Sequence, residues 1–323
     1  MAFYKGTALA NDLKELIVKT PMLEVNYVAD IILPEISVKE TAGKIPVLST
    51  SAGMKTLDLK RGKRGAFKRG EWTWGNDSYT TFEYGYEEPI DNVEALDNAD
   101  IFNEEIIAGN IAKSQLFLAR EKRVAEAVFN TTTFAAAADS LTITNEWDDA
   151  TNADAFGDIT DAQAKSFAKC GKPRISMHLL CNEAIFRNIM RSTKVRADVK
   201  YTRDIISQPL QAQQQYFASF LGIAAVHIAT SFVDTSSLGV EAATFETLWS
   251  DEYAMYFYPA QANLNSWKVP GLGRQPVWGK FSKDYRLERY GEDQSDSLII
   301  RAREYRGEHI DVTYGVLMDN MTT

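Results

Sequence analysis

The side chains that most often carry enzymatic chemistry are few in this sequence, and their positions do not suit a reaction. The chain has three histidines, His178, His227 and His309. Histidine is the usual general base near neutral pH, but His178 and His227 each lie within an apolar run that predicts a strand. We interpret both as histidines of a core or an interface. His309 lies near a predicted turn and could titrate, but no cysteine or histidine neighbour completes a ligand set with it.

Three further patterns match catalytic or ligand-binding motifs only in part. Gly271-Leu-Gly273-Arg274 lacks the Lys-Ser/Thr ending of a phosphate-binding loop, and we interpret it as a turn. No serine lies in the G-x-S-x-G context of a nucleophile elbow. An acidic stretch lacks the spacing and the closing glutamate of a calcium loop, and predicts a solvated loop: Asp148, Asp149, Asp154 and Asp158. We therefore expect no enzyme, with no catalytic residue, cofactor or bound metal.

The composition describes an acidic protein with enough apolar residues for a substantial core. Of its 323 residues, 45% are hydrophobic, and the formal net charge is −9. A protein that binds nucleic acid over its whole surface needs an excess of Lys and Arg, so this class is excluded, although local basic patches are compatible with the composition. Cys170 and Cys181 are too few for a disulfide framework, which fits a reducing compartment, and we expect both to be buried thiols.

The start of the chain and its apolar runs predict neither export nor a membrane span. Residues 1–20 lack a basic start followed by an apolar stretch and a cleavage site. The longest apolar runs, such as 220–228, are shorter than the ~20 residues that cross a bilayer. We expect a soluble cytoplasmic protein that makes no membrane contact.

The segment 49–90 combines a cluster of cations with a run of aromatic residues. The cations surround glycines, as in a mobile loop or hairpin tip, and the aromatics then alternate as in a strand. Two interpretations stay open, contact with nucleic acid and contact with an acidic surface of an adjacent copy. The acidity of the whole chain favours the second, because every copy then offers complementary charge. The contact residues we expect are Lys60, Arg61, Lys63, Arg64, Lys68, Arg69, Trp72 and Trp74.

Two other segments in the first 130 residues have a clear character. Residues 1–48 include an apolar run, 28–38, that is broken by Pro34 and predicts an extended arm. Another part of the fold or another chain must cover its apolar side chains. Residues 91–130 contain no proline and carry apolar residues at helical spacing, with acidic residues first and basic residues after them, as the helix dipole favours. This segment predicts one long helix backed by a sheet.

From residue 131 onward the chain predicts a compact mixed portion. Asn182 is expected to cap a helix, and the polar, glutamine-rich segment 196–219 predicts a surface loop. Strands are predicted at 175–181, 222–229, 253–258, 298–305 and 309–317. The mixture of helices and strands predicts the α+β class.

The order of these segments resembles the major capsid proteins of tailed bacteriophages, of the Hong Kong 97 type. The likeness extends over nearly the whole chain and rests on the sequence order of several stretches. These stretches are Ile32 to Val38, Lys172 to His178 with the helix after Asn182, Leu221 to Val226, Leu248 to Tyr256, and Arg301 to Arg306 before Tyr314 to Met318.

The resemblance implies an α+β Hong Kong 97-type capsid fold with an N-terminal arm, an extended β-hairpin loop, a peripheral domain with a long spine helix, and an axial domain. It places Glu292, Asp293 and Asp296 at the tip of the peripheral domain, near three-fold contacts between subunits. The implied boundaries are 1–48 for the arm, 49–90 for the loop hairpin, 91–171 for the peripheral domain with its spine helix, 172–270 for the axial domain, 271–311 for the peripheral return strands and tip, and 312–323 for the C-terminal strand.

The resemblance also implies a structural function. Copies of the chain would assemble as hexamers and pentamers into an icosahedral head around double-stranded DNA, which they contact non-specifically. The implied partners are a separate scaffolding protein and a portal protein, and a decoration protein stays open. The implied location is the virion, after assembly in the host cytoplasm. Two alternatives are kept, an encapsulin-like nanocompartment shell and a cytoplasmic enzyme without a recognisable motif.

Overall fold

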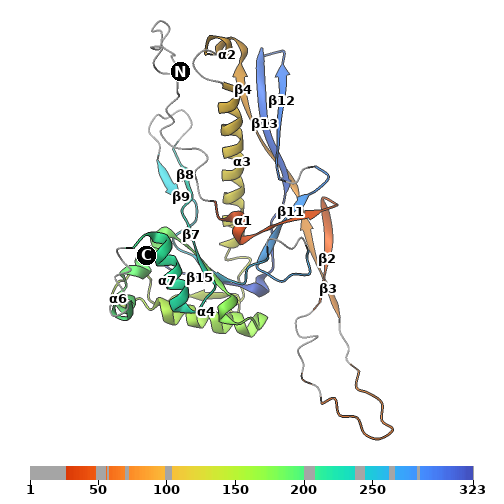
Figure 1. The fold of residues 1–323 in the computed structure, drawn as a ribbon, viewed down its shortest axis with the longest axis vertical. Coiled ribbons are helices and arrows are strands. Elements are labelled where there is room, and N and C mark those ends of the chain that lie inside the picture. The colour runs from red at the N-terminus through yellow and green to blue at the C-terminus, as the bar shows by residue number, and fades with distance from the viewer. Residues whose placement is uncertain are drawn as a thin grey trace.

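The structure is a computed structural model that describes residues 27–48, 56, 58–69, 73–98, 104–199, 208–236, 244–261, 266–281 and 284–322. The chain is mixed α+β, as its sequence predicts. Figure 1 shows an elongated molecule, with a long helix beside a long sheet at one end, a compact portion at the other, and a hairpin that projects from the body. Trp72 and the predicted arm before residue 27 lie outside the described residues.

The long sheet is built around β13 (Ser297–Arg306), which pairs antiparallel along its whole length with β4 (Phe82–Asp91). On its other side, β13 pairs with β12 (Arg286–Glu292). The far end of β13 meets β11 (Gly273–Trp278). Two short strands complete this sheet beside β11, β1 (Glu35–Val38) in parallel and β14 (His309–Ile310) antiparallel.

One face of the long sheet is covered by α3 (Glu104–Val128), which follows the shorter α2 (Asn92–Asn98). The buried residues Ala108, Ala112 and Leu116 of α3 recur every four positions and so lie on one side of the helix. Because two of the three are alanines, the helix axis lies close to the strands. The prediction of a helix backed by a sheet is confirmed.

The compact portion is a five-stranded sheet in the order β5, β15, β10, β6, β7. The central strands β10, β6 and β15 are almost entirely buried. The strands are β5 (Ser140–Thr142), β15 (Gly315–Asp319), β10 (Ala254–Phe257), β6 (His178–Asn182) and β7 (Ala225–Ala229). The helices of this portion are α4 (Ala155–Cys170), α5 (Glu183–Arg191), α6 (Thr193–Val199) and α7 (Leu210–Leu221). A separate pair of strands is β8 (Phe232–Asp234) with β9 (Phe245–Thr247).

The central strands of the compact sheet send alternate side chains into two cores. Tyr256 and Val316 belong to the core that α4, α5, α6 and α7 cover. Met255, Phe257 and Leu317 belong to a second core that includes the end of α3. Successive side chains of a strand point to opposite faces, so a strand between two cores is apolar on both. Full burial of each such side chain stabilises the fold by about 1.5–3 kcal/mol, and the sheet is the common wall between the two halves of the molecule.

Most apolar side chains of the run 28–38 are buried within their own chain, and Ile31 is the exception at 52% exposed. The run forms α1 (Ala29–Ile32) and β1, and β1 lies against β11. Ile32 and Leu33 have no exposed surface and belong to the second core. Of the two ways to cover such a segment, a different part of the same fold is the one that the structure shows for these residues.

A two-stranded hairpin projects from the body, as the sequence predicts. β2 (Ala42–Leu48) pairs antiparallel with β3 (Trp74–Thr80), and most of their side chains are exposed. The described segment 58–69 forms the far end of this projection (Figure 1). The first strand therefore comes from the region predicted as the arm, and the aromatic strand that follows Thr81 is β4 of the long sheet.

One helical prediction is confirmed in part and one loop prediction was wrong. The segment 91–130 contains α2 and α3, and residues 99–103 between them lie outside the described residues. The surface loop predicted over 196–219 contains most of α7, which begins after Pro209 and ends at Gly222 in the left-handed region (φ 66°). Glutamine favours helices nearly as well as leucine, so the polarity of this segment did not indicate a loop.

Three strand and turn predictions also differ from the structure. The strand predicted over 309–317 is interrupted by a 3₁₀ turn (Val312–Tyr314), because the Asp311 carboxylate accepts the Thr313 amide. A 3₁₀ turn (Arg174–Ser176) likewise replaces the start of the strand predicted at 175–181. The expected turn at Gly271–Arg274 instead leads into β11. A Cβ atom on Gly273 would lie 2.2 Å from the His309 carbonyl oxygen, so this glycine permits close strand approach.

The acidic loop predicted around Asp148 and Asp158 is wrong in its second half, because Asp158 lies in α4 and accepts the Trp147 indole N–H at 2.8 Å. Two other local predictions agree with the structure. Asn182 caps α5 by accepting the Ala184 amide at 2.9 Å. Cys170 and Cys181 are buried free thiols, and burial raises the pKa of Cys181 to about 12. Within the described ranges, no helix is long and apolar enough to span a membrane.

Candidate inter-subunit surfaces

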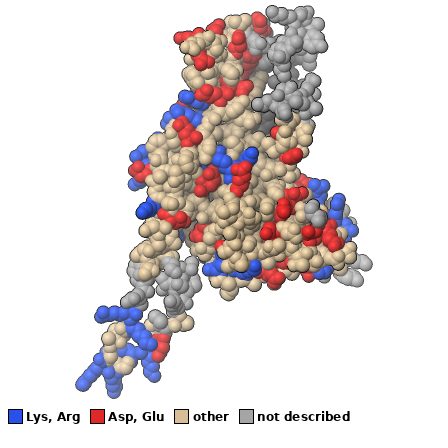
Figure 2. All heavy atoms as spheres, turned by 180° about the vertical axis from the view of Figure 1, so that it is seen from behind, with Lys and Arg blue, Asp and Glu red and all other residues tan. Residues whose placement is uncertain are grey.

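The far end of the hairpin, residues 58–69, is a basic tip. It carries six cations against a single carboxylate, that of Asp58, which accepts the Lys60 amide at 3.1 Å. Leu59 and Phe67 are 72% and 70% exposed among these cations, and the Arg61 guanidinium lies 4.8 Å from the Phe67 ring centroid. Figure 2 shows the tip as a blue end on the molecule. The tip thus exposes two apolar side chains within a rim of positive charge.

The structure gathers the predicted basic contact residues at this tip, and two tryptophans differ from them. All six cations are exposed: Lys60, Arg61, Lys63, Arg64, Lys68 and Arg69. Trp74 lies nearer the body, at the start of β3, and is 60% exposed. Trp72 falls outside the described residues.

The turn between β12 and β13, at the opposite end of the molecule, is acidic. Glu292, Asp293 and Asp296 are all exposed there, and red atoms gather at this end in Figure 2. Asp296 has a φ of 46°, and its carboxylate accepts the Asn92 side-chain amide at 2.9 Å, which holds the turn against α2. Leu96 of α2 is 79% exposed. The cationic and anionic residues that the sequence predicts as contacts therefore lie at opposite ends of one copy (Figure 1), where they cannot meet each other.

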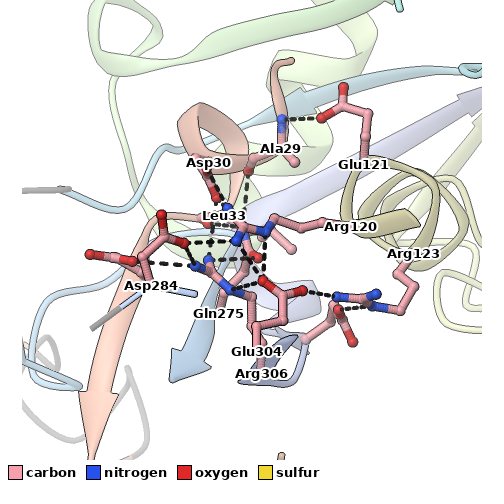
Figure 3. A network of polar contacts seen from close by, with 12 residues as sticks. Ala29, Asp30, Leu33, Arg120, Glu121, Arg123, Gln275, Asp284, Glu304 and Arg306 are labelled. Carbon is pink, nitrogen blue, oxygen red and sulfur yellow. Dashed lines mark hydrogen bonds and ion pairs between the residues drawn. The ribbon is translucent and has the colours of Figure 1, made fainter. Parts of the chain in front are cut away.

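A third set of charges is buried where α3 meets the long sheet, and the sequence did not predict it (Figure 3). Glu304 is fully buried and accepts from Arg120 Nε at 3.1 Å and from Arg123 Nη2 at 2.8 Å. Arg306 donates to Asp284 at 2.9 Å. A signal was present in the sequence, because Glu304 and Arg306 lie at two-residue spacing from Ala302 and so share its buried face.

The network also anchors the first described residues. Asp30 of α1 accepts from Arg120 at 3.2 Å and from the Gln275 side-chain amide at 3.0 Å. Burial alone would lower the pKa of Arg120, but the charges of Glu304 and Asp30 outweigh it and raise that pKa. Each buried charge thus has partners within the chain, which is the condition for a buried ion pair to be tolerated.

Glu121, the next residue of α3, holds α1 by a different means. Its fully buried carboxylate accepts the amides of Val28 and Ala29 at 3.0 and 2.9 Å and the indole N–H of Trp249 at 2.7 Å. Burial raises the pKa of Glu121, and these hydrogen bonds oppose the shift. The carboxylate therefore serves to fix the start of α1 against the helix.

The two strand histidines lie side by side on β6 and β7. Nδ1 of His178 and Nε2 of His227 are 2.8 Å apart, so one ring donates to the other. Burial, assisted by the neighbouring His227, lowers the pKa of His178 to about 4, and burial lowers that of His227. Both rings are neutral at pH 7 and partner each other, which agrees with the interpretation as structural histidines. No group of three or more potential metal ligands occurs in the part of the chain that the structure describes.

The fold is similar to solved structures of phage proteins over nearly its whole length. A phage-related protein from Bordetella bronchiseptica RB50 matches with a TM-score of 0.67 at 15% identity, over 91% of this chain and 92% of that one. The capsid of the cyanophage P-SCSP1u matches with a TM-score of 0.59 at 9% identity, over 98% and 92%. The mature capsid of bacteriophage PhiM1 matches with a TM-score of 0.57 at 12% identity, over 94% and 90%.

These likenesses define the class of fold. The chain has the Hong Kong 97-type capsid fold, and the proteins that share it here include phage capsids. No protein-family model matches the sequence, and no curated protein matches it. The fold expected from the order of the segments is thus confirmed by structure.

Proposed function

We propose that this chain is the major capsid protein of a tailed bacteriophage, a non-catalytic subunit whose copies form hexamers and pentamers and close an icosahedral head around double-stranded DNA. The observation that carries the proposal is the likeness to phage capsids over nearly the whole chain. Its location is the virion, after assembly in the host cytoplasm with a separate scaffolding protein and a portal protein.

The two charged ends supply a contact between copies. We infer that the basic tip of one copy lies on acidic surface of a neighbour, with Glu292, Asp293 and Asp296 among the contact residues. Such a head-to-tail contact joins two different patches, and patches of this kind form rings when the rotation closes. Each exposed ion pair contributes only ~0–1 kcal/mol, but the contact is repeated at every copy and guides the approach of subunits.

The net charge of the chain also determines the kind of contact that we propose with DNA. A chain with a net charge of −9 holds packaged DNA by enclosure, with few phosphate contacts and none that depend on base sequence. A nanocompartment shell would share the fold and differ in its contents.

Charge reversal at the tip tests the proposed contact. In the test variant Lys63, Arg64, Lys68 and Arg69 are replaced by Glu, and in the matched control the same change is made at four exposed cations away from the tip: Lys122, Arg187, Arg196 and Lys280. We expect the test variant to fold and to form few shells, while the control assembles like the parent, by negative-stain electron microscopy.

The same images test the function itself. Closed particles of the parent chain, formed alone or with its scaffolding protein, are the expected result. A chain that stays monomeric under both conditions contradicts the capsid function, and particles filled with protein cargo in place of DNA identify a nanocompartment. Equal particle yields from the test and control variants would contradict only the role of the tip.

A further inference from the structure

The base of the projecting hairpin is attached to the body by a small aromatic cluster. Tyr79 of β3 stacks on Trp267, with ring centroids 5.5 Å apart and planes 24° apart. Trp267 in turn meets the edge of the His309 ring at 5.2 Å. His309 Nε2 lies 2.8 Å from the Asp77 carboxylate, so its ring bonds the same strand that carries Tyr79. Three segments far apart in the sequence therefore meet at this one place.

A tight backbone contact lies just behind this cluster. The amide and the hydroxyl of Thr81 both donate to the Thr41 carbonyl, at 2.7 and 2.9 Å. Gly307 passes so close that a Cβ atom there would lie 2.0 Å from the Thr80 carbonyl oxygen. These contacts hold the two strands where they leave the body, at a point with no space for a side chain on Gly307.

The two sets of contacts differ in how far they lie along the hairpin. Tyr79 and Asp77 are two and four residues beyond Thr81, which places them roughly 7 and 13 Å along an extended strand. Contacts at that distance control the direction of the hairpin, because a small rotation about its base would separate Tyr79 and Asp77 from their partners on the body. They are also exchangeable, since Asp77 is 47% exposed and its side chain can return to water.

We propose that Asp77, Tyr79, Trp267 and His309 form a releasable latch that fixes the direction in which the β2–β3 hairpin projects, and that the contacts of Thr41, Thr81 and Gly307 are its pivot. With the latch closed the hairpin has one direction. With the latch open the paired strands swing as a unit, and a neighbouring copy can select a different angle.

Pulsed electron spin resonance on the full-length, unassembled chain tests the latch. Nitroxide labels are attached to cysteines at Val47→Cys on β2 and Lys122→Cys on α3, both exposed positions, while the native cysteines are buried. We expect one narrow distance distribution for the labelled parent. Adding His309→Ala or Trp267→Leu shifts it or widens it roughly twofold, because the direction is no longer fixed.

Two further variants separate the latch from general damage. Lys280→Ala removes another ion pair near the hairpin, with Glu40 at 3.9 Å, and is expected to leave the distribution unchanged. His309→Gln keeps an N–H donor for Asp77 and is expected to give an intermediate width. Parent-like distributions in folded His309→Ala and Trp267→Leu, judged by circular dichroism, overturn the proposal. The measurement needs no assembly, so its outcome is independent of the proposed capsid function.

Discussion

The basic tip and the buried network use the same side chains in opposite ways. In the network, Arg120 and Arg306 are 5% and 1% exposed and each bonds carboxylates of its own chain. In the tip, six cations are exposed and share one local carboxylate. Since burying an unpaired charge is costly, internal pairing is a condition of folding for the network. The tip is under no such condition, so its charges are free to specify a partner.

This difference suggests that the buried network serves the folding of one copy and that the tip serves contacts between copies. The network joins α1, α3 and the long sheet, and it determines whether the body forms at all. The tip is exposed and adds little to the fold of one copy, and we propose that its charges act in contacts between copies. Substitutions in the network should therefore change the free energy of unfolding, and substitutions in the tip should change the yield of assembled shells.

The largest effect is expected from Glu304→Gln in the network. The substitution keeps the shape of the side chain and removes the charge that Arg120 and Arg123 share, so it should lower the free energy of unfolding by about 3–5 kcal/mol. Urea unfolding measures this loss. The control is Glu126→Gln, an exposed partner of Lys122, which should cost less than ~0.5 kcal/mol. Similar losses in the two variants would remove the distinction between buried and exposed charges.

A smaller effect is expected from pH. His178 has a pKa of about 4 in the fold and 6.5 when unfolded, so the unfolded chain binds more protons between these values. The contribution of His178 is complete above pH 6.5 and is lost as the pH falls toward 4. We expect about 1–2 kcal/mol, discounted for partial solvent exposure.

Comparison with His178→Gln separates this contribution from that of the carboxyl groups that titrate in the same range. The difference in unfolding free energy between pH 7 and pH 4.5 should be smaller in the variant than in the parent. We therefore expect acid to destabilise the body of the protein. Equal pH dependence in the parent and the variant would show that the histidine pair does not contribute.

The smallest effect on stability is expected at the tip. Leu59→Ser and Phe67→Ser should each change the free energy of unfolding by less than ~0.5 kcal/mol, because both side chains are exposed. Leu33→Ala, at a fully buried position, should cost ~2–5 kcal/mol in the same assay. If Phe67→Ser approached the cost of Leu33→Ala, the tip would be packed against its own body and the comparison would fail.

The sequence predicted those parts of the fold whose signal is local. The strand around Met255 was recognisable because its apolar side chains serve two cores, and Asn182 was recognisable as a cap because the capping bond is made two residues away. The basic tip was recognisable from its cations and glycines. In each case the residues that make the structure lie within a few positions of each other.

What the sequence could not predict depends on distant partners. Glu304 and Arg120 are 184 positions apart, and nothing in either neighbourhood indicates the other. The latch likewise needs Asp77 and His309 to meet across 232 positions. The helix α7 was missed for a different reason, since its glutamines were interpreted through polarity although their backbone preference is helical.

Because β1 pairs with β11, β1 cannot complete its pairing until most of the chain has been synthesised. The Gln275 side chain bonds the Leu33 carbonyl, 242 positions earlier in the chain, and a ribosome adding ~5–20 residues per second needs roughly 10–50 s to bridge that interval. Throughout that time the core that Ile32 and Leu33 enter is incomplete, whereas the neighbouring β2–β3 pair can form once Thr80 has emerged. Several nascent chains on one messenger RNA therefore expose this apolar segment at the same time and close to one another. This makes them candidates for binding by a folding chaperone.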